Sequence, residues 1–177
     1  MKALKWLFYV IVLVAIVIVG GSFVLPSQVT VTRSTEIAAP PEKVFAIVGD
    51  YRRFTEFSPW ADIDPNTKYT IEGPDGGVGQ KMTWQSDNPD VRTGSQTIVE
   101  YQAPSLVKSA LDLGPMGKPT ATWNLEPAGA GTKATWTLDS PLDGMVARWL
   151  GFLMFETWVG AEYEKGLARL KVAAEKP

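Results

Sequence analysis

The sequence predicts an α+β domain in which helices cover one face of a single antiparallel sheet. The first observation is the order of the elements, which is one strand, two short helices, six strands and a long closing helix. The second is the alternation of apolar and polar residues along the strands, typical of a sheet with one buried face. The third is the closing segment from Asp143 to about Glu175, where apolar residues recur at helical spacing. Strands grouped together and helices grouped apart favour this class over a parallel α/β sheet.

Local signals predict each element of this domain. Residues 29–37 alternate between apolar and polar side chains and predict a first strand. Pro41 lies where the first turn of a helix begins, and Asp50 is a suitable N-cap for a second short helix over residues 51–57. Six further strands are predicted in pairs joined by turns that contain proline or glycine: 67–73 with 78–86, 95–102 with 106–113, and 120–126 with 133–139.

The closing helix has two unlike halves. Asp143 is its predicted N-cap, and from Trp149 to Trp158 almost every side chain is large and apolar. The second half carries Glu and Lys residues that suit solvent. Because the first half is apolar all round, we expect protein, lipid or a ligand to cover it.

Composition narrows the possible functions. The chain has 177 residues, a formal net charge of −2 and neither histidine nor cysteine. It therefore lacks a basic surface for nucleic acid, and no nucleic-acid partner is predicted. Without histidine the commonest general base and metal ligand is absent, so we predict no metal and no cofactor.

The amino-terminal segment has the pattern of a membrane anchor. Lys2 and Lys5 precede an uncharged run over residues 6–25, and about 20 apolar residues span a bilayer. We predict a transmembrane anchor over residues 1–26 and a domain over residues 27–177. The localisation expected from the flanking charges is the plasma (inner) membrane, single-pass, with a cytoplasmic amino terminus and a periplasmic domain. A cleaved signal peptide is the alternative.

Strand parity predicts which side chains face the closing helix. Three strand tryptophans and several helix aromatics converge on one surface, where they either fill a core or line a cavity for an apolar ligand. The predicted ligand cavity comprises Met82, Trp84, Val107, Leu111, Leu113, Trp123, Leu125, Trp136, Leu138, Trp149, Phe152, Glu156, Val159 and Tyr163.

Glu156 and Tyr163 are the candidate acid–base groups. Both lie on the helical stripe that faces the sheet, where burial would raise the pKa of a carboxyl group. The alternative for Glu156 is a position in water at the cavity mouth, or an ion pair with Arg148. No catalytic residue is assigned.

Three segments near the start of the domain form a recognisable pattern: residues 36–45 (EIAAPPEKVF), residues 50–54 (DYRRF) and residues 58–60 (SPW). They resemble the opening of the START-like superfamily, also called SRPBCC, and in particular its bacterial polyketide cyclase/dehydrase-type members. Residues 131–136 (GTKATW) and 164–171 (EKGLARLK) fit later parts of the same pattern, so the resemblance covers about residues 30–174. It implies a helix-grip fold, with a curved seven-stranded antiparallel sheet around a long carboxy-terminal helix. It also implies a cavity that holds a hydrophobic small molecule.

The main functional hypothesis is a membrane-anchored START-like domain that binds a lipid, an isoprenoid or an aromatic compound. One alternative is a cyclase or dehydratase that uses the cavity carboxylate or tyrosine. Another is a non-enzymatic module that binds a protein partner through exposed aromatic side chains.

Overall fold

The structure is a computed structural model that describes residues 2–176. Its elements, in chain order, are α1 (Lys2–Val24), β1 (Gln28–Ile37), α2 (Pro41–Val48), the 3₁₀ helix η1 (Tyr51–Glu56), α3 (Trp60–Ile63), β2 (Lys68–Glu72), β3 (Lys81–Gln85), β4 (Gly94–Gln102), β5 (Leu106–Asp112), the 3₁₀ helix η2 (Gly114–Met116), β6 (Thr120–Ala128), β7 (Gly131–Pro141), α4 (Met145–Leu150), the π-helical segment η3 (Gly151–Phe155) and α5 (Glu156–Glu175).

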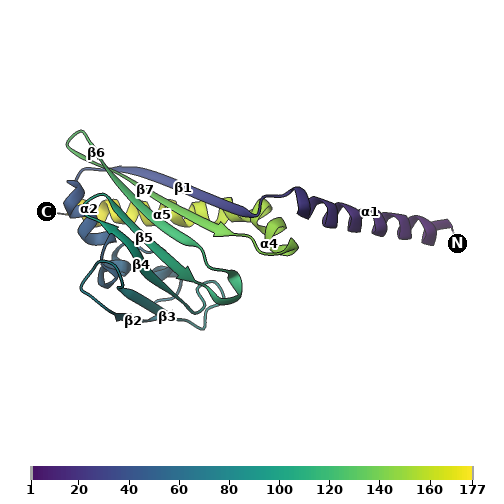
Figure 1. Ribbon diagram of the computed structural model, residues 1–177, viewed down its shortest axis with the longest axis horizontal. Coiled ribbons are helices and arrows are strands. Elements are labelled where there is room, and N and C mark those ends of the chain that lie inside the picture. The colour runs from purple at the N-terminus through teal and green to yellow at the C-terminus, as the bar shows by residue number, and fades with distance from the viewer. Residues whose placement is uncertain (1, 177) are drawn as a thin grey trace.

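The seven strands form one antiparallel sheet in the order β1-β7-β6-β5-β4-β3-β2. Consecutive strands pair as neighbours except β1, which pairs with the last strand, β7, along its whole length from Gln28 to Ile37. In Figure 1 the closing helix α5 lies along one side of the sheet, and α1 projects away from the domain. The predicted fold class, a seven-stranded antiparallel sheet with a long carboxy-terminal helix, is confirmed.

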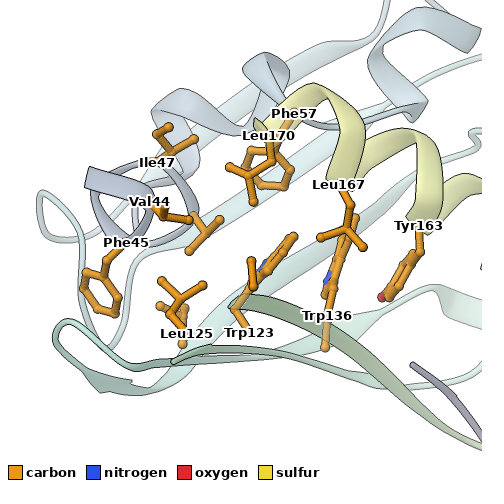
Figure 2. Close-up of a cluster of buried hydrophobic side chains, with 14 of the residues drawn as sticks. Val44, Phe45, Ile47, Phe57, Trp123, Leu125, Trp136, Tyr163, Leu167 and Leu170 are labelled. Carbon is orange, nitrogen blue, oxygen red and sulfur yellow. The ribbon is translucent and has the colours of Figure 1, made fainter. Parts of the chain in front are cut away.

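The buried face of the sheet follows strand parity. Trp123 and Leu125 on β6 and Trp136 on β7 are buried. The residues between them are only partly buried, as expected for a sheet with one buried face. In Figure 2 the rings of Trp123, Trp136 and Tyr163 lie in a row beneath α5. Leu167 and Leu170 of α5 and Val44 of α2 complete the core on this side.

The sequence predicted Asp143 as the N-cap of the closing helix, and this prediction is wrong. The residue before α4 is Gly144, whose φ of 88° lies in the left-handed region that glycine adopts without strain. The chain therefore turns sharply after β7, and Asp143 lies outside the helix. The helix also contains a π-helical turn over Gly151–Phe155. Because of that turn, the parts of the helix before and after it present different faces to the sheet. Residue periodicity did not predict this change.

The predicted membrane anchor and the predicted localisation are wrong. Within residues 2–176, no helix is both long enough and apolar enough to cross a membrane. The uncharged run over residues 6–25, from which the anchor was predicted, includes the last turns of α1. These turns contact the domain. The indole Nε1 of Trp149 donates to the carbonyl of Ile18 at 2.9 Å, and Arg148 Nη1 donates to the carbonyl of Ser22 at 2.9 Å. Ser22 is itself buried.

Candidate functional site

A cavity of about 170 Å³ lies between the inner face of the sheet and the first turns of α5. Its wall is mostly apolar and contains four tryptophans. The lining residues are Phe54, Trp60, Tyr69, Trp84, Asp90, Val91, Gln96, Leu111, Leu113, Met116, Pro119, Ala121, Trp136, Leu138, Ser140, Phe155, Trp158, Val159 and Tyr163.

A stack of three aromatic rings begins in the cavity wall, at Tyr163 and Trp136, and continues into the core at Trp123. Tyr163 of α5 stacks on Trp136 of β7 with ring centroids 3.8 Å apart and planes 10° apart. The other face of Trp136 stacks on Trp123 of β6, with centroids 4.4 Å apart. Trp60 meets Trp136 edge to face. Each such pair contributes about 0.5–1.5 kcal/mol beyond area burial, so this end of the cavity is held firmly in place.

The other end of the cavity is its mouth, where lining residues reach solvent. Met116 of η2 and Trp158 of α5 are about half exposed, and Asp90 of the β3–β4 loop is exposed. Trp84 of β3 lies over Gly94 of β4, because a Cβ at residue 94 would come within 2.5 Å of the Trp84 ring. The missing side chain of Gly94 is therefore what allows this indole to lie in the cavity wall.

Half of the sequence-predicted cavity residues lie in the cavity wall, and the other half lie elsewhere. The wall contains Trp84, Leu111, Leu113, Trp136, Leu138, Val159 and Tyr163. Packed in the core instead are Met82, Val107, Trp123 and Leu125. Outside the domain core, Trp149 contacts α1, while Phe152 and Glu156 are exposed. The role of the lining residues in holding a ligand stays a prediction.

Two groups of lining residues escaped the sequence analysis. Phe54, Trp60, Tyr69, Asp90 and Val91 lie on connecting segments or on the outermost strand, and parity on the central strands does not place them. Phe155 is the last residue of the π-helical turn and Trp158 follows it. The turn shifts the helical stripe away from Phe152 and Glu156. One available signal was the alternation of strand β4, which places Gln96 on the inner face with Ile98.

The polar groups of the cavity wall are few. Gln96 is 93% buried, and its amide nitrogen Nε2 has no hydrogen-bond partner. The indole Nε1 of Trp136 is also buried without a partner. Burial raises the pKa of Tyr163 well above its usual value, and burial likewise raises the pKa of Tyr69. Both hydroxyls are therefore protonated at neutral pH.

Glu156 lies outside the cavity, in an exposed ion pair. Its carboxylate accepts from Arg33 Nη1 at 2.9 Å, and Glu164 accepts from Arg33 Nε at 2.9 Å. Arg33 passes directly over Gly160, where a Cβ would overlap its guanidinium. The expected partner Arg148 instead donates to α1. Glu156 is therefore not placed to act as an acid or a base in the cavity.

Two further polar residues outside the cavity wall have structural partners. Gln80 is fully buried, accepts from the backbone N–H of Tyr51 at 2.9 Å and donates to Asp50 Oδ1 at 2.9 Å. Asp62 pairs with Arg169 of α5. A second hollow, of about 370 Å³, lies on the outer surface of α5, where it is bordered by charged side chains and carries no candidate chemistry.

Comparison with solved structures gives the same fold. The KanY protein, solved by NMR, matches with a TM-score of 0.62 at 19% identity, covering 85% of this chain and 100% of that one. The di-domain ARO/CYC BexL from the BE-7585A biosynthetic pathway matches with a TM-score of 0.64 at 17% identity, covering 85% of this chain and 51% of that one. An uncharacterised protein from Rhizobium leguminosarum matches with a TM-score of 0.62 at 16% identity, covering 85% and 96%. At these identities the likeness shows the fold alone.

No curated protein matches this sequence. A family model described as polyketide cyclase / dehydrase and lipid transport matches residues 28–175, which span the whole sheet and its closing helix. The chain therefore belongs to the polyketide cyclase/dehydrase and lipid transport family.

Proposed function

We propose that this domain binds a small, mainly apolar molecule in the cavity between its sheet and α5. The observation that carries the proposal is the cavity itself, about 170 Å³ in volume and walled by aromatic and aliphatic side chains. Apolar burial supplies the affinity, and aromatic walls favour ring-shaped ligands through stacked and edge-to-face contacts. The family description, which names lipid transport beside cyclase and dehydrase activity, is consistent with such a ligand.

The size of the cavity favours a compact aromatic ligand over a whole lipid or isoprenoid. An apolar protein cavity of about 150 Å³ accommodates benzene, whereas sites for drug-sized ligands have volumes of about 300–1,000 Å³. A chain longer than one or two rings would have to extend through the mouth beside Met116 and Trp158.

Binding is favoured over a cyclase or dehydratase reaction because of the titratable groups in the wall. Among the described lining residues these are Asp90, Tyr69 and Tyr163. The raised pKa values of the two tyrosines suit hydrogen bonding and make them poor general bases at neutral pH. Asp90 is exposed at the mouth rather than enclosed with a substrate.

The test is binding of ethylbenzene, followed by NMR shifts of the methyl groups of Leu111, Leu138 and Val159. Ala121→Leu should abolish binding, because the added methyl groups occupy the cavity that Ala121 lines. Ala110→Leu is the matched control, since Ala110 lies on the neighbouring strand with its side chain on the other face. The control should bind like the wild type.

Absence of ethylbenzene binding by the wild type would overturn the proposal. So would equal binding by the wild type and Ala121→Leu, because the ligand would then occupy some other site.

A further inference from the structure

The cavity wall contains a buried side-chain amide whose nitrogen has no hydrogen-bond partner. Gln96 lies on the inner face of β4, between Met82 of β3 and Leu111 of β5 in the register of the sheet. Both flanking side chains are apolar. The amide nitrogen Nε2 is buried and makes no hydrogen bond.

An unpaired buried donor is costly, and the sheet did not have to contain one. Leaving such a group unsatisfied costs the full desolvation of that group, whereas an apolar side chain of similar shape carries no such cost. The neighbouring inward position on the same strand is Ile98, which is fully buried. A glutamine at residue 96 is therefore explained most simply by a partner that comes from outside the chain.

A second unpaired donor lies in the same wall. Trp136 Nε1 is buried without a partner, although indole N–H groups usually find one when buried. The described lining residues include neither lysine nor arginine. The wall residues therefore carry two unpaired neutral N–H donors and no positive charge, a combination that matches an uncharged oxygen acceptor better than a carboxylate or a phosphate.

We infer that the ligand of this cavity is an aromatic carbonyl compound, and that Gln96 selects it by donating a hydrogen bond to the carbonyl oxygen. The inference rests on the proposed binding function and adds the chemical class of the ligand. A carbonyl fits better than a hydroxyl group, because a carbonyl accepts without bringing a further donor into an apolar cavity. Stacking against the aromatic wall holds the ring, and the amide sets its orientation.

Two probes of nearly the same shape test this assignment. Acetophenone differs from ethylbenzene only in having a carbonyl group where ethylbenzene has a methylene. The measured quantity is the ratio of their dissociation constants, Kd for acetophenone divided by Kd for ethylbenzene, in the wild type and in Gln96→Met. Comparing the ratio between proteins cancels the different costs of removing the two probes from water.

Gln96→Met should raise this ratio by roughly 3- to 10-fold, the effect of one neutral hydrogen bond. Ethylbenzene should bind the variant as well as it binds the wild type, because methionine keeps the length and volume of the side chain. Gln102→Met is the matched control. Gln102 lies on the same strand, is exposed and donates to Glu100 at 2.7 Å, so the control should leave the ratio unchanged.

The outcomes separate this inference from the proposed function. If ethylbenzene binds and Gln96→Met leaves the ratio within twofold of the wild type, the inference is overturned while the binding function stands; a water molecule bound to the amide would give this result. If ethylbenzene does not bind the wild type, the proposed function fails, and the inference fails with it.

Discussion

Asp50 joins a helix end to the buried interior. Its Oδ1 accepts from the backbone N–H of Arg52 at 3.0 Å, which caps η1, and from Gln80 Nε2 at 2.9 Å. Gln80 in turn holds the N–H of Tyr51, so one carboxylate organises the start of η1 and the adjoining turn. Burial alone would raise the pKa of Asp50, but hydrogen bonds from Arg52 and Gln80 outweigh it and hold the pKa below its usual value.

The lowered pKa predicts acid sensitivity at this residue. Because the carboxyl group is a stronger acid in the folded than in the unfolded protein, it contributes stability above its unfolded pKa of about 4. That contribution is lost as the pH falls through the lower, folded pKa. Asp50→Asn should therefore reduce the fall in the free energy of unfolding between about pH 5 and pH 2. Urea titrations at several pH values measure this.

Asp87→Asn is the control for the Asp50 prediction. Asp87 is exposed on the β3–β4 loop, and its substitution should leave the shape of the pH profile unchanged. A wild-type acid response in Asp50→Asn would show that other carboxylates govern the loss of stability.

At the scale of elements, the edge strand β1 is held by two close approaches. At its end, Gly131 of the β6–β7 hairpin lies so close to β1 that a Cβ would overlap the backbone carbonyl of Ile37. In its middle, Gly160 of α5 lies against the guanidinium of Arg33, a flexible side-chain end. An added Cβ would approach an atom of β1 about equally closely at either glycine. At Gly131 that atom belongs to the backbone, whereas at Gly160 it belongs to a side chain.

The two glycines should therefore respond differently to alanine. Gly131→Ala should destabilise the domain by about 1–3 kcal/mol, as overpacking does, because paired strands must shift. Gly160→Ala should change stability by no more than about 1 kcal/mol, because it disturbs exposed ion pairs and improves helix propensity. Urea unfolding followed by tryptophan fluorescence compares the two variants. Equal losses would mean that Arg33 cannot move aside.

At the scale of the whole molecule, the two ends of the domain meet. Lys171 of α5 donates to the carbonyl of Glu36 at 2.9 Å, and Glu175 accepts from the N–H of Ala38 at 2.7 Å. These contacts join α5 to the end of β1 and hold the helix across the sheet (Figure 1). The cavity lies between the sheet and the first turns of α5.

A ligand that binds only the folded protein should raise the free energy of unfolding of the whole domain. Ethylbenzene at ten times its Kd should raise the free energy of unfolding of the wild type by about 1.4 kcal/mol, through mass action. Ala121→Leu should show no such increase, whereas Ala110→Leu should match the wild type. Thermal unfolding of the three proteins with and without ethylbenzene measures this increase in stability. Stabilisation of Ala121→Leu to the same extent would place the probe outside the cavity.

Much of the fold was predictable from local patterns. The alternation over residues 29–37, the helix start at Pro41 and the N-cap at Asp50 are short-range signals, and the structure has β1, α2 and η1 at those places. Alternation in the strands also placed Trp84, Leu111, Trp136 and Leu138 on the inner face. Residue order carries this information because side-chain direction within one strand depends only on parity.

The candidate site was predictable only in part. Parity identifies a face but does not say how far the helix lies from it, so Trp123 and Leu125 were grouped with Trp136 although only Trp136 reaches the cavity. The stripe that contained Phe152 and Glu156 assumed a regular α-helix. The π-helical turn at Gly151–Phe155 moves Phe155 and Trp158 into the wall instead.

The sequence by itself determined the order of the elements, the inner face of the central strands and the resemblance to the START-like superfamily, because these depend on local periodicity and turn chemistry. The tertiary structure alone decided that a void of about 170 Å³ remains, that Glu156 pairs with Arg33 and that α4 contacts the last turns of α1. Those features depend on distances between segments more than 100 residues apart. Packing of the complete chain sets such distances, and no pattern of neighbouring residues encodes them.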